Sequence, residues 1–362
     1  MNMDHFINEV KHNSIELNDF NRSNAYNFIK TELENKKYIF IGESSHCVKE
    51  YTIAKVNLIK FLHQKMGFKI IAFESELGDC MVGDYLSTEL DAFNFMYGSI
   101  GRIWHNEYTL ELFNYIQENK KENPLYLTGI DVQQSENKHF SAFLTKHFKD
   151  EYYKKLFVEA DKNMNKILNL KRIKKHNLLE EVNEIKETIN ILINKLEIRP
   201  LNNGNLQKVL IRTLINRTDY LNFIVEKGFS KEFQYREKQM ARNFEFIAQE
   251  LYPNEKIIIW AHNLHVKRKS SINRFTSYSS FFENLHDSIK DDSLVLGLYA
   301  HKGRMGDYNG SDYPIKKSRK KNLEWLLSHS PYEKFFIKCN LNWGQKNGKY
   351  LREAGYVCLM FQ

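Results

Sequence analysis

Two short segments of this 362-residue chain carry histidines and a carboxylate at a spacing that could support catalysis. Residues 42–46 (GESSH) place the carboxylate of Glu43 three positions before the imidazole of His46, and a second segment (WAHNLHV) carries His262 and His265. An imidazole can act as a general base near neutral pH, and a neighbouring carboxylate can orient it and support its protonated form. These residue types predict a site that activates water, with His46 as the first candidate for the base.

Two further carboxylates follow apolar runs, where a buried strand would end. Glu74 comes directly after the run IIAF, and Asp131 comes directly after the run LYLTGI. A carboxylate at the end of a buried strand needs a partner, because an unpaired charge is costly away from water. Either His46 or His262 would satisfy Glu74.

The apolar runs that precede these side chains have the pattern of strands in a parallel sheet. The run 37–42 predicts a buried strand, and the helical spacing of apolar residues over 47–66 predicts a helix that ends at Gly67. A second strand is predicted at 69–73. Such a unit implies parallel strands with a right-handed crossover, and ligands bind at the carboxyl ends of parallel strands. We therefore expect the histidine and carboxylate segments to meet at one edge of the sheet.

The rest of the chain divides into a helical segment and further strands. From about residue 137 to 251 strand patterns are almost absent, and 151–199 contains no glycine. The predicted fold class is α/β, with a mixed, mostly parallel central sheet flanked by helices and a helical insert that forms a deep cleft. The expected parts are 1–136 and 252–362 for the core and 137–251 for the insert. Further strands are predicted at 125–130, 256–260, 293–299 and 356–361, and a helix at 108–119.

Other residues near His46 permit rival mechanisms. An α/β serine hydrolase needs G-x-S-x-G, and the chain has no such match, which leaves Ser44 or Ser45 as an unusual nucleophile. Cys47 is adjacent to His46, but sequence neighbours on a helix do not face each other. The histidines and Glu74 have the ligand types of catalytic zinc, without a diagnostic spacing. A metal-free site without a cofactor is predicted first, and a divalent metal stays an open alternative.

Composition argues against several classes of protein. The hydrophobic fraction is 42%, no window approaches the roughly 18 apolar residues of a membrane span, and the polar N-terminus does not resemble a signal peptide. Four widely spaced cysteines without a C-x-x-C pair indicate a cytoplasmic protein. We expect no membrane partner, and the oligomeric state is left open.

The net charge of +8 is concentrated in three basic clusters, at 171–175, 267–269 and 316–321. Such clusters are typical of solvated loops or helix faces, and a phosphate-binding surface is the alternative. No nucleic-acid motif accompanies them, so we expect no nucleic-acid partner.

Six separated motifs occur along the chain in a fixed order. They are G-E-x-x-H-x-x-x-E from Gly42 to Glu50, the strand 70–74, Trp104 with Glu107, G-x-D from Gly129 to Asp131, R-x-x-x-M-x-x-N from Arg236 to Asn243, and W-A-H-N-x-H-V from Trp260 to Val266. Together they resemble the erythromycin esterase family over about residues 36–300. The last sixty residues add a strand but no motif.

The resemblance implies an α/β core beside helical elements, with a deep cleft between them. Family enzymes hydrolyse the lactone ester of 14-membered macrolides such as erythromycin, so the implied partners are a macrolide and water. Likeness at the level of the fold does not fix the substrate. A hydrolase of a different ester or amide, and a non-catalytic protein that binds a ligand or metal, therefore remain alternatives.

The resemblance also implies a role for each motif residue. His46 would be the general base that activates water, with Glu43 as its support. Glu74 would orient or polarise the reacting groups, and His262 would complete the catalytic set.

Four further residues would assist these groups or contact the substrate, namely His265, Lys55, Asp131 and Trp104. The resemblance places His265 either behind the catalytic residues or facing the substrate. Many members have arginine where this chain has Lys55. Lysine keeps the charge but lacks the planar fork of arginine, which weakens the case for an oxyanion contact by Lys55.

Overall fold

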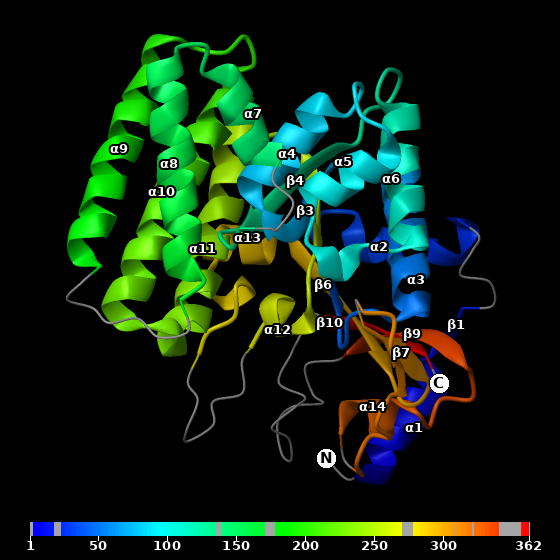
Figure 1. The fold of residues 1–362 in the computed structure, drawn as a ribbon. Helices are drawn as coiled ribbons and strands as arrows, with labels where there is room; N and C mark the ends of the chain where they lie inside the picture. Colours follow the sequence, from blue (N-terminus) through cyan, green and yellow to red (C-terminus); the bar gives the residue numbers. More distant parts are fainter. Residues whose placement is uncertain are drawn as a thin grey trace.

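A mixed sheet with helices on both faces forms the centre of the molecule (Figure 1). The computed structural model describes residues 3–17, 23–134, 139–170, 178–269, 278–307, 309–320, 322–339 and 356–361. Within these residues the order of the main sheet is β1-β9-β10-β6-β2-β5-β3-β4. The strands from β10 to β4 are parallel, and β9 runs antiparallel to β10 and β1. The predicted mixed, mostly parallel sheet flanked by helices is confirmed.

The central strands are apolar over most of their length because both of their faces are covered. On β2, Tyr38 and Phe40 point into one core, and Ile39 and Ile41 point into the core on the other face. The strands of the main sheet are β1 (Ile15–Glu16), β2 (Tyr38–Glu43), β3 (Phe68–Glu76), β4 (Tyr126–Asp131), β5 (Lys256–Trp260), β6 (Ser293–Ala300), β9 (Lys334–Cys339) and β10 (Tyr356–Phe361).

Helices α2, α3, α5 and α6 lie on one side of the sheet (Figure 1). The predicted helix after the first strand is α3, and Gly67 ends it with a left-handed backbone conformation (φ 72°) that favours glycine. The helices outside the lobe are α1 (Met3–Asn13), α2 (Ile29–Leu33), α3 (Lys49–Met66), α4 (Leu77–Leu86), α5 (Ala92–Ser99), α6 (Glu107–Asn119), α12 (Asn263–Val266), α13 (Asp287–Asp291) and α14 (Leu323–Leu327).

The described part of the segment between β4 and β5 contains helices joined by short loops and no strand, as predicted, and it forms a lobe beside the sheet (Figure 1). Arg217 fastens this lobe to β3, because its guanidinium bonds both carboxylate oxygens of Glu76 at 2.7 Å. The lobe shares one hydrophobic core with a face of the sheet. Because a shared core does not mark where the lobe ends, the predicted boundaries of the lobe, 137–251, stay a prediction. Its helices are α7 (His139–His147), α8 (Glu151–Leu168), α9 (Leu179–Ile198), α10 (Gly204–Lys227) and α11 (Glu232–Phe246), followed by a π-helical turn (Ile247–Leu251).

Several short elements near the C-terminus were not predicted from the sequence. Strand β9 lies between β10 and the short edge strand β1, and a separate antiparallel hairpin is formed by β7 (Arg304–Gly306) and β8 (Asp312–Pro314). Each hairpin strand has only three residues, none of them buried, which is too few for an alternating apolar pattern. No helix in the described part of the chain has the length and hydrophobicity needed to cross a membrane.

Candidate active site

The sheet brings the predicted residues together at the carboxyl ends of its strands. Glu43 is the last residue of β2, Glu74 lies near the end of β3, Asp131 ends β4, and His262 follows β5. Hydrogen bonds and ring contacts connect all eight predicted residues into one cluster. Their convergence follows from parallel strands ending at one edge of the sheet.

His46 is oriented by the carboxylate three residues before it. Its Nδ1 lies 2.9 Å from Oε1 of Glu43, and the other oxygen of Glu43 lies 2.9 Å from Nζ of Lys55. Burial would raise the pKa of Glu43, but Lys55 and His46 outweigh it and hold that pKa below its usual value. An ionised Glu43 accepts the Nδ1–H of His46, so Nε2 is left as the basic nitrogen. The His46 side chain is 27% exposed, which leaves room for water to reach it.

Lys55 is buried completely and acts on Glu43 from behind. Its Nζ lies 4.7 Å from the ring centre of Trp260 and 5.6 Å from that of Trp104, and it bonds the carbonyl oxygen of Ala261 at 3.4 Å. Burial lowers the pKa of Lys55 and the neighbouring Glu43 opposes this. With no exposed surface, Lys55 is placed to stabilise Glu43 and not to contact a substrate.

His262 is fixed as a hydrogen-bond donor. Its Nδ1 accepts the backbone N–H of Leu264 at 3.0 Å, at the start of α12, so the proton of the neutral ring is on Nε2. Burial and the adjacent His46 lower the pKa of His262 to about 4. The ring is therefore neutral near pH 7, and its centre lies 4.8 Å from that of His46.

His265 lies between two carboxylates in the interior. Its Nε2 is 3.0 Å from Oε1 of Glu74, and its Nδ1 bonds Oε1 of Glu237. Burial opposes protonation, but these two carboxylates raise the pKa of His265 to about 9. Only 4% of the residue is exposed, so it lies behind the other histidines and does not face a substrate.

Glu74 is paired with other side chains than His46 or His262, which were the partners expected from the sequence. Neither the imidazole of His46 nor that of His262 pairs with Glu74; its partners are His265, Arg236 and the backbone N–H of His262 at 2.8 Å. Burial would raise the pKa of Glu74, but His265 and Arg236 hold it well below its usual value. The expected partners were wrong because a strand pattern does not reveal which element covers a strand end.

Arg236 and Glu237 complete the cluster from α11 and were not among the predicted site residues. Arg236 donates from Nε to Oδ1 of Asp131 at 2.9 Å and from its terminal nitrogen to Glu74 at 2.9 Å. Arg236 is the first residue of one of the motifs, so the sequence offered a reason to include it in the site. Nothing in the sequence distinguishes Glu237 from its neighbours.

Trp104 forms one wall of the site. Its ring meets that of His46 edge to face, with 4.7 Å between centres, and it lies 6.0 Å from Trp260. The rival nucleophiles have other partners, because Ser44 Oγ is 3.0 Å from the hydroxyl of Tyr51 and Cys47 donates to the carbonyl of Ile103. These contacts engage the Ser44 hydroxyl and the Cys47 thiol with groups other than a histidine.

The donor groups of the site are largely engaged with one another. Both nitrogens of His265 and both oxygens of Glu43 are bonded to protein groups. Among the described residues, no group of three His, Cys, Asp or Glu side chains is placed to hold a metal ion. The absence of a cofactor stays a prediction.

Comparisons with known proteins identify a family over most of the chain, beginning after the Gly42–Glu50 motif, and solved structures that share the fold. A family model described as erythromycin esterase matches residues 63–356. The Bacillus subtilis (strain 168) protein YbfO, which is named as a candidate hydrolase, is 27% identical over 316 residues, covering 78% of this chain and 69% of YbfO.

Three solved structures share the fold. A Bacillus cereus protein has a TM-score of 0.74 and 15% identity, covering 100% of this chain and 98% of its own. A protein described as a succinoglycan biosynthesis protein has a TM-score of 0.76 and 12% identity, with coverage of 99% and 97%. A mutant of the erythromycin esterase EreC in its open conformation has a TM-score of 0.67 and 14% identity, with 94% of each chain covered. At these identities the likeness shows the fold alone.

Proposed function

The chain belongs to the erythromycin esterase family, and on this premise we propose that it is a carboxylic ester hydrolase in which His46 activates water. The observation that carries the proposal is the pairing of two histidines that are held in opposite roles. Glu43 holds Nδ1 of His46 and leaves Nε2 basic, whereas the amide of Leu264 holds Nδ1 of His262 and leaves Nε2 protonated. A base and a neutral donor thus lie 4.8 Å apart between ring centres.

In the proposed reaction, Nε2 of His46 removes a proton from water as the water oxygen attacks the ester carbonyl carbon. The carbonyl double bond opens to an oxyanion, and the Nε2–H of His262 is available to donate to it. Glu43 stabilises the imidazolium form of His46 through Nδ1. The oxyanion then collapses, the carbon–oxygen bond to the alcohol breaks, and His46 returns its proton to the departing alkoxide.

Glu74 acts in this proposal as a positioning residue. It accepts the backbone N–H of His262 at 2.8 Å and so fixes the residue at which α12 begins. His265 and Arg236 neutralise Glu74 in the interior, which makes its buried charge tolerable. A satisfied buried network of this kind is rigid, and rigidity keeps His262 beside His46.

For the substrate we propose a macrolide lactone, supported by the family and by the fold shared with an erythromycin esterase. Hydrolysis of a lactone keeps both halves in one molecule, so the product is heavier than the substrate by one water.

Incubation of the protein with erythromycin and macrolides of other ring sizes, followed by mass spectrometry, tests both levels of the proposal. A product with one added water supports them. If the macrolides stay intact while simpler esters are hydrolysed, the proposed macrolide substrate is refuted and the proposed ester hydrolase activity is supported. Failure to hydrolyse any ester would refute the proposed activity.

A further inference from the structure

A hollow of about 740 Å³ opens beside the loop that carries His46. Ser44 and Ser45 line it, together with Ala300 at the end of β6. Strand β2 has β6 on one side and β5 on the other, so the hollow flanks the loop on the side away from His262. Ser45 directly precedes His46, and successive Cα atoms are about 3.8 Å apart, so the backbone of the proposed base lies next to the lining of the hollow.

The hollow is basic. Lys316, Lys317 and Arg319 line it against a single carboxylate, that of Glu324. Within the described part of the chain, none of these three cations forms an ion pair with a carboxylate. The positive charge also affects a neighbouring side chain: burial and the charge of Lys317 lower the pKa of His301. We call this space the basic hollow; it contains part of the third basic cluster of the sequence.

Two other hollows provide a contrast. The one beside the β7–β8 hairpin has four basic residues (Lys49, Lys302, Arg304 and Lys334) and four acidic ones (Glu50, Asp307, Asp312 and Glu333), so its charges balance.

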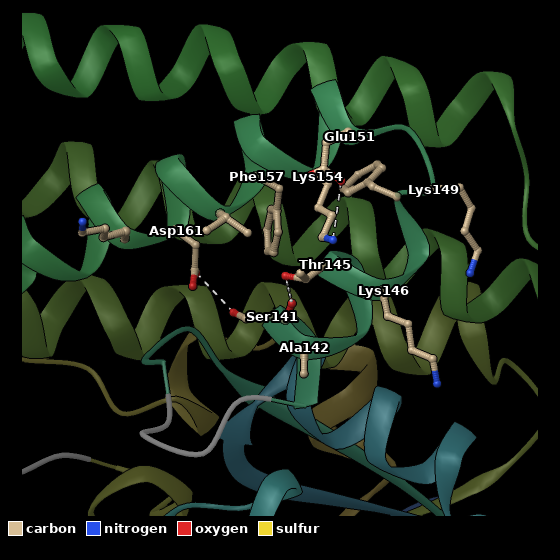
Figure 2. A pocket seen from close by; sticks show the side chains of 12 residues that line it. Ser141, Ala142, Thr145, Lys146, Lys149, Glu151, Lys154, Phe157 and Asp161 are labelled. Atoms are coloured by element: carbon tan, nitrogen blue, oxygen red, sulfur yellow. Dashed lines mark hydrogen bonds and ion pairs between the residues drawn. The ribbon is translucent and has the colours of Figure 1, made fainter.

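The hollow between α7 and α8 has lysines on its rim, but Lys154 pairs with Glu151, and the amino groups of Lys146 and Lys149 point away from Phe157 (Figure 2). The hollow beside the hairpin therefore has no excess of positive charge, and the hollow between α7 and α8 has no wall at the candidate site.

The size and lining of the basic hollow suit part of an organic molecule. Ligand pockets are commonly about 300–1,000 Å³, which is far more than a single anion fills. Hydroxyl and amide groups of Ser45, Ser318 and Asn322 accompany the cations. Cations with N–H and O–H donors form the environment that carboxylate, phosphate and sulfate groups prefer.

We propose that the basic hollow binds an anionic group of the ester substrate while the ester bond lies at His46. The inference rests on the proposed ester hydrolysis but names a different ester from the macrolide lactone proposed above, since erythromycin carries a basic amine and no anionic group. It predicts that the preferred ester carries a carboxylate, phosphate or sulfate a few bonds away from the bond that is cleaved.

Two chromogenic esters of equal length test the proposal. The wild-type protein should hydrolyse 4-nitrophenyl hydrogen adipate, which carries a carboxylate, with a higher kcat/KM than 4-nitrophenyl hexanoate, which is neutral. The variant Lys316→Ala/Lys317→Ala/Arg319→Ala should lower this preference about tenfold, mainly through KM, because three exposed charge interactions are lost. Added salt should weaken the wild-type preference, since these charges are exposed to solvent.

The control variant Lys146→Ala/Lys149→Ala removes similar charges from the rim of the hollow between α7 and α8, and it should keep the wild-type preference. The inference is overturned if the wild type shows no preference for the anionic ester, or if the triple variant retains it. Circular dichroism and thermal unfolding establish that each variant is folded; if the triple variant is not, Lys317→Glu replaces it and should lower the preference in the same direction.

A different outcome separates this inference from the proposed function. If the wild type hydrolyses no ester at all, the proposed activity is refuted, and the anion site is then tested by a binding measurement. Isothermal titration with inorganic phosphate should then give binding to the wild type that is about tenfold weaker in the triple variant. Equal binding to both proteins, or none to the wild type, overturns the anion site as well.

Discussion

Replacing His265 and Glu237 together by glutamine should remove a pH dependence from the stability of the protein. In the wild type, Glu74 and Glu237 raise the pKa of the buried His265 to about 9, against 6.5 for an ordinary histidine. The double variant deletes the imidazole and one of its carboxylates, while Arg236 remains to neutralise Glu74. A comparison of the two proteins therefore isolates the titration of His265.

The magnitude follows from the difference between the folded and the ordinary pKa. Each tenfold change in proton affinity corresponds to about 1.4 kcal/mol, so a pKa of about 9 instead of 6.5 contributes about 3 kcal/mol. Because the folded pKa is raised, this contribution is fully present below pH 6.5 and is lost as the pH rises through about 9. Between pH 6 and pH 9.5 the wild type should lose about 3 kcal/mol more stability than the double variant.

Urea unfolding of both proteins at a series of pH values, followed by circular dichroism, measures the free energy of unfolding. The slopes with denaturant concentration are compared, so that a change in the unfolded state is recognised. If both proteins lose stability in parallel over this pH range, His265 is not held as a cation between the two carboxylates, and the reasoning is refuted.

Three further changes probe other parts of the site. Lys55→Met should lower the free energy of unfolding by about 3–5 kcal/mol, because it removes the buried cation that pairs with Glu43, and adding Glu43→Gln should restore part of the loss in a denaturant titration. His262→Ala should reduce kcat about 10²–10³-fold in an ester assay if its N–H serves the oxyanion, and an unchanged kcat would remove it from that role. Since the pKa of His262 is about 4, the acidic limb of the wild-type rate profile should contain no step from this residue between pH 5 and pH 8.

The sequence is sufficient to predict the parallel core and the edge at which the site forms. Runs such as 257–260 are apolar throughout because both faces of β5 are covered, and this pattern is visible without a structure. The histidines and carboxylates after those runs meet because parallel strands end together. Helix α3 was likewise predictable, since its apolar spacing and Gly67 are local features.

What covers the strand ends was not predictable from local patterns. Glu237 joins the site because α11 packs over the end of β4, and one glutamate in a charged helix has no distinguishing neighbour in the sequence. Residues 316–319 form a basic surface whose position beside Ser45 depends on how the hairpin and the following loop fold back. Such contacts join residues far apart in the chain, so they are properties of the tertiary structure.

The central claim, that His46 is the base which activates water, is tested most directly by the hydrolysis rate of His46→Gln. The measurement is kcat for an ester that the wild type hydrolyses, with thermal unfolding as the control for folding. We predict at least a hundredfold loss of kcat with little change in stability, because His46 is partly exposed and general-base catalysis contributes about 10²–10⁴-fold. A folded variant that hydrolyses the ester at the wild-type rate would contradict the claim.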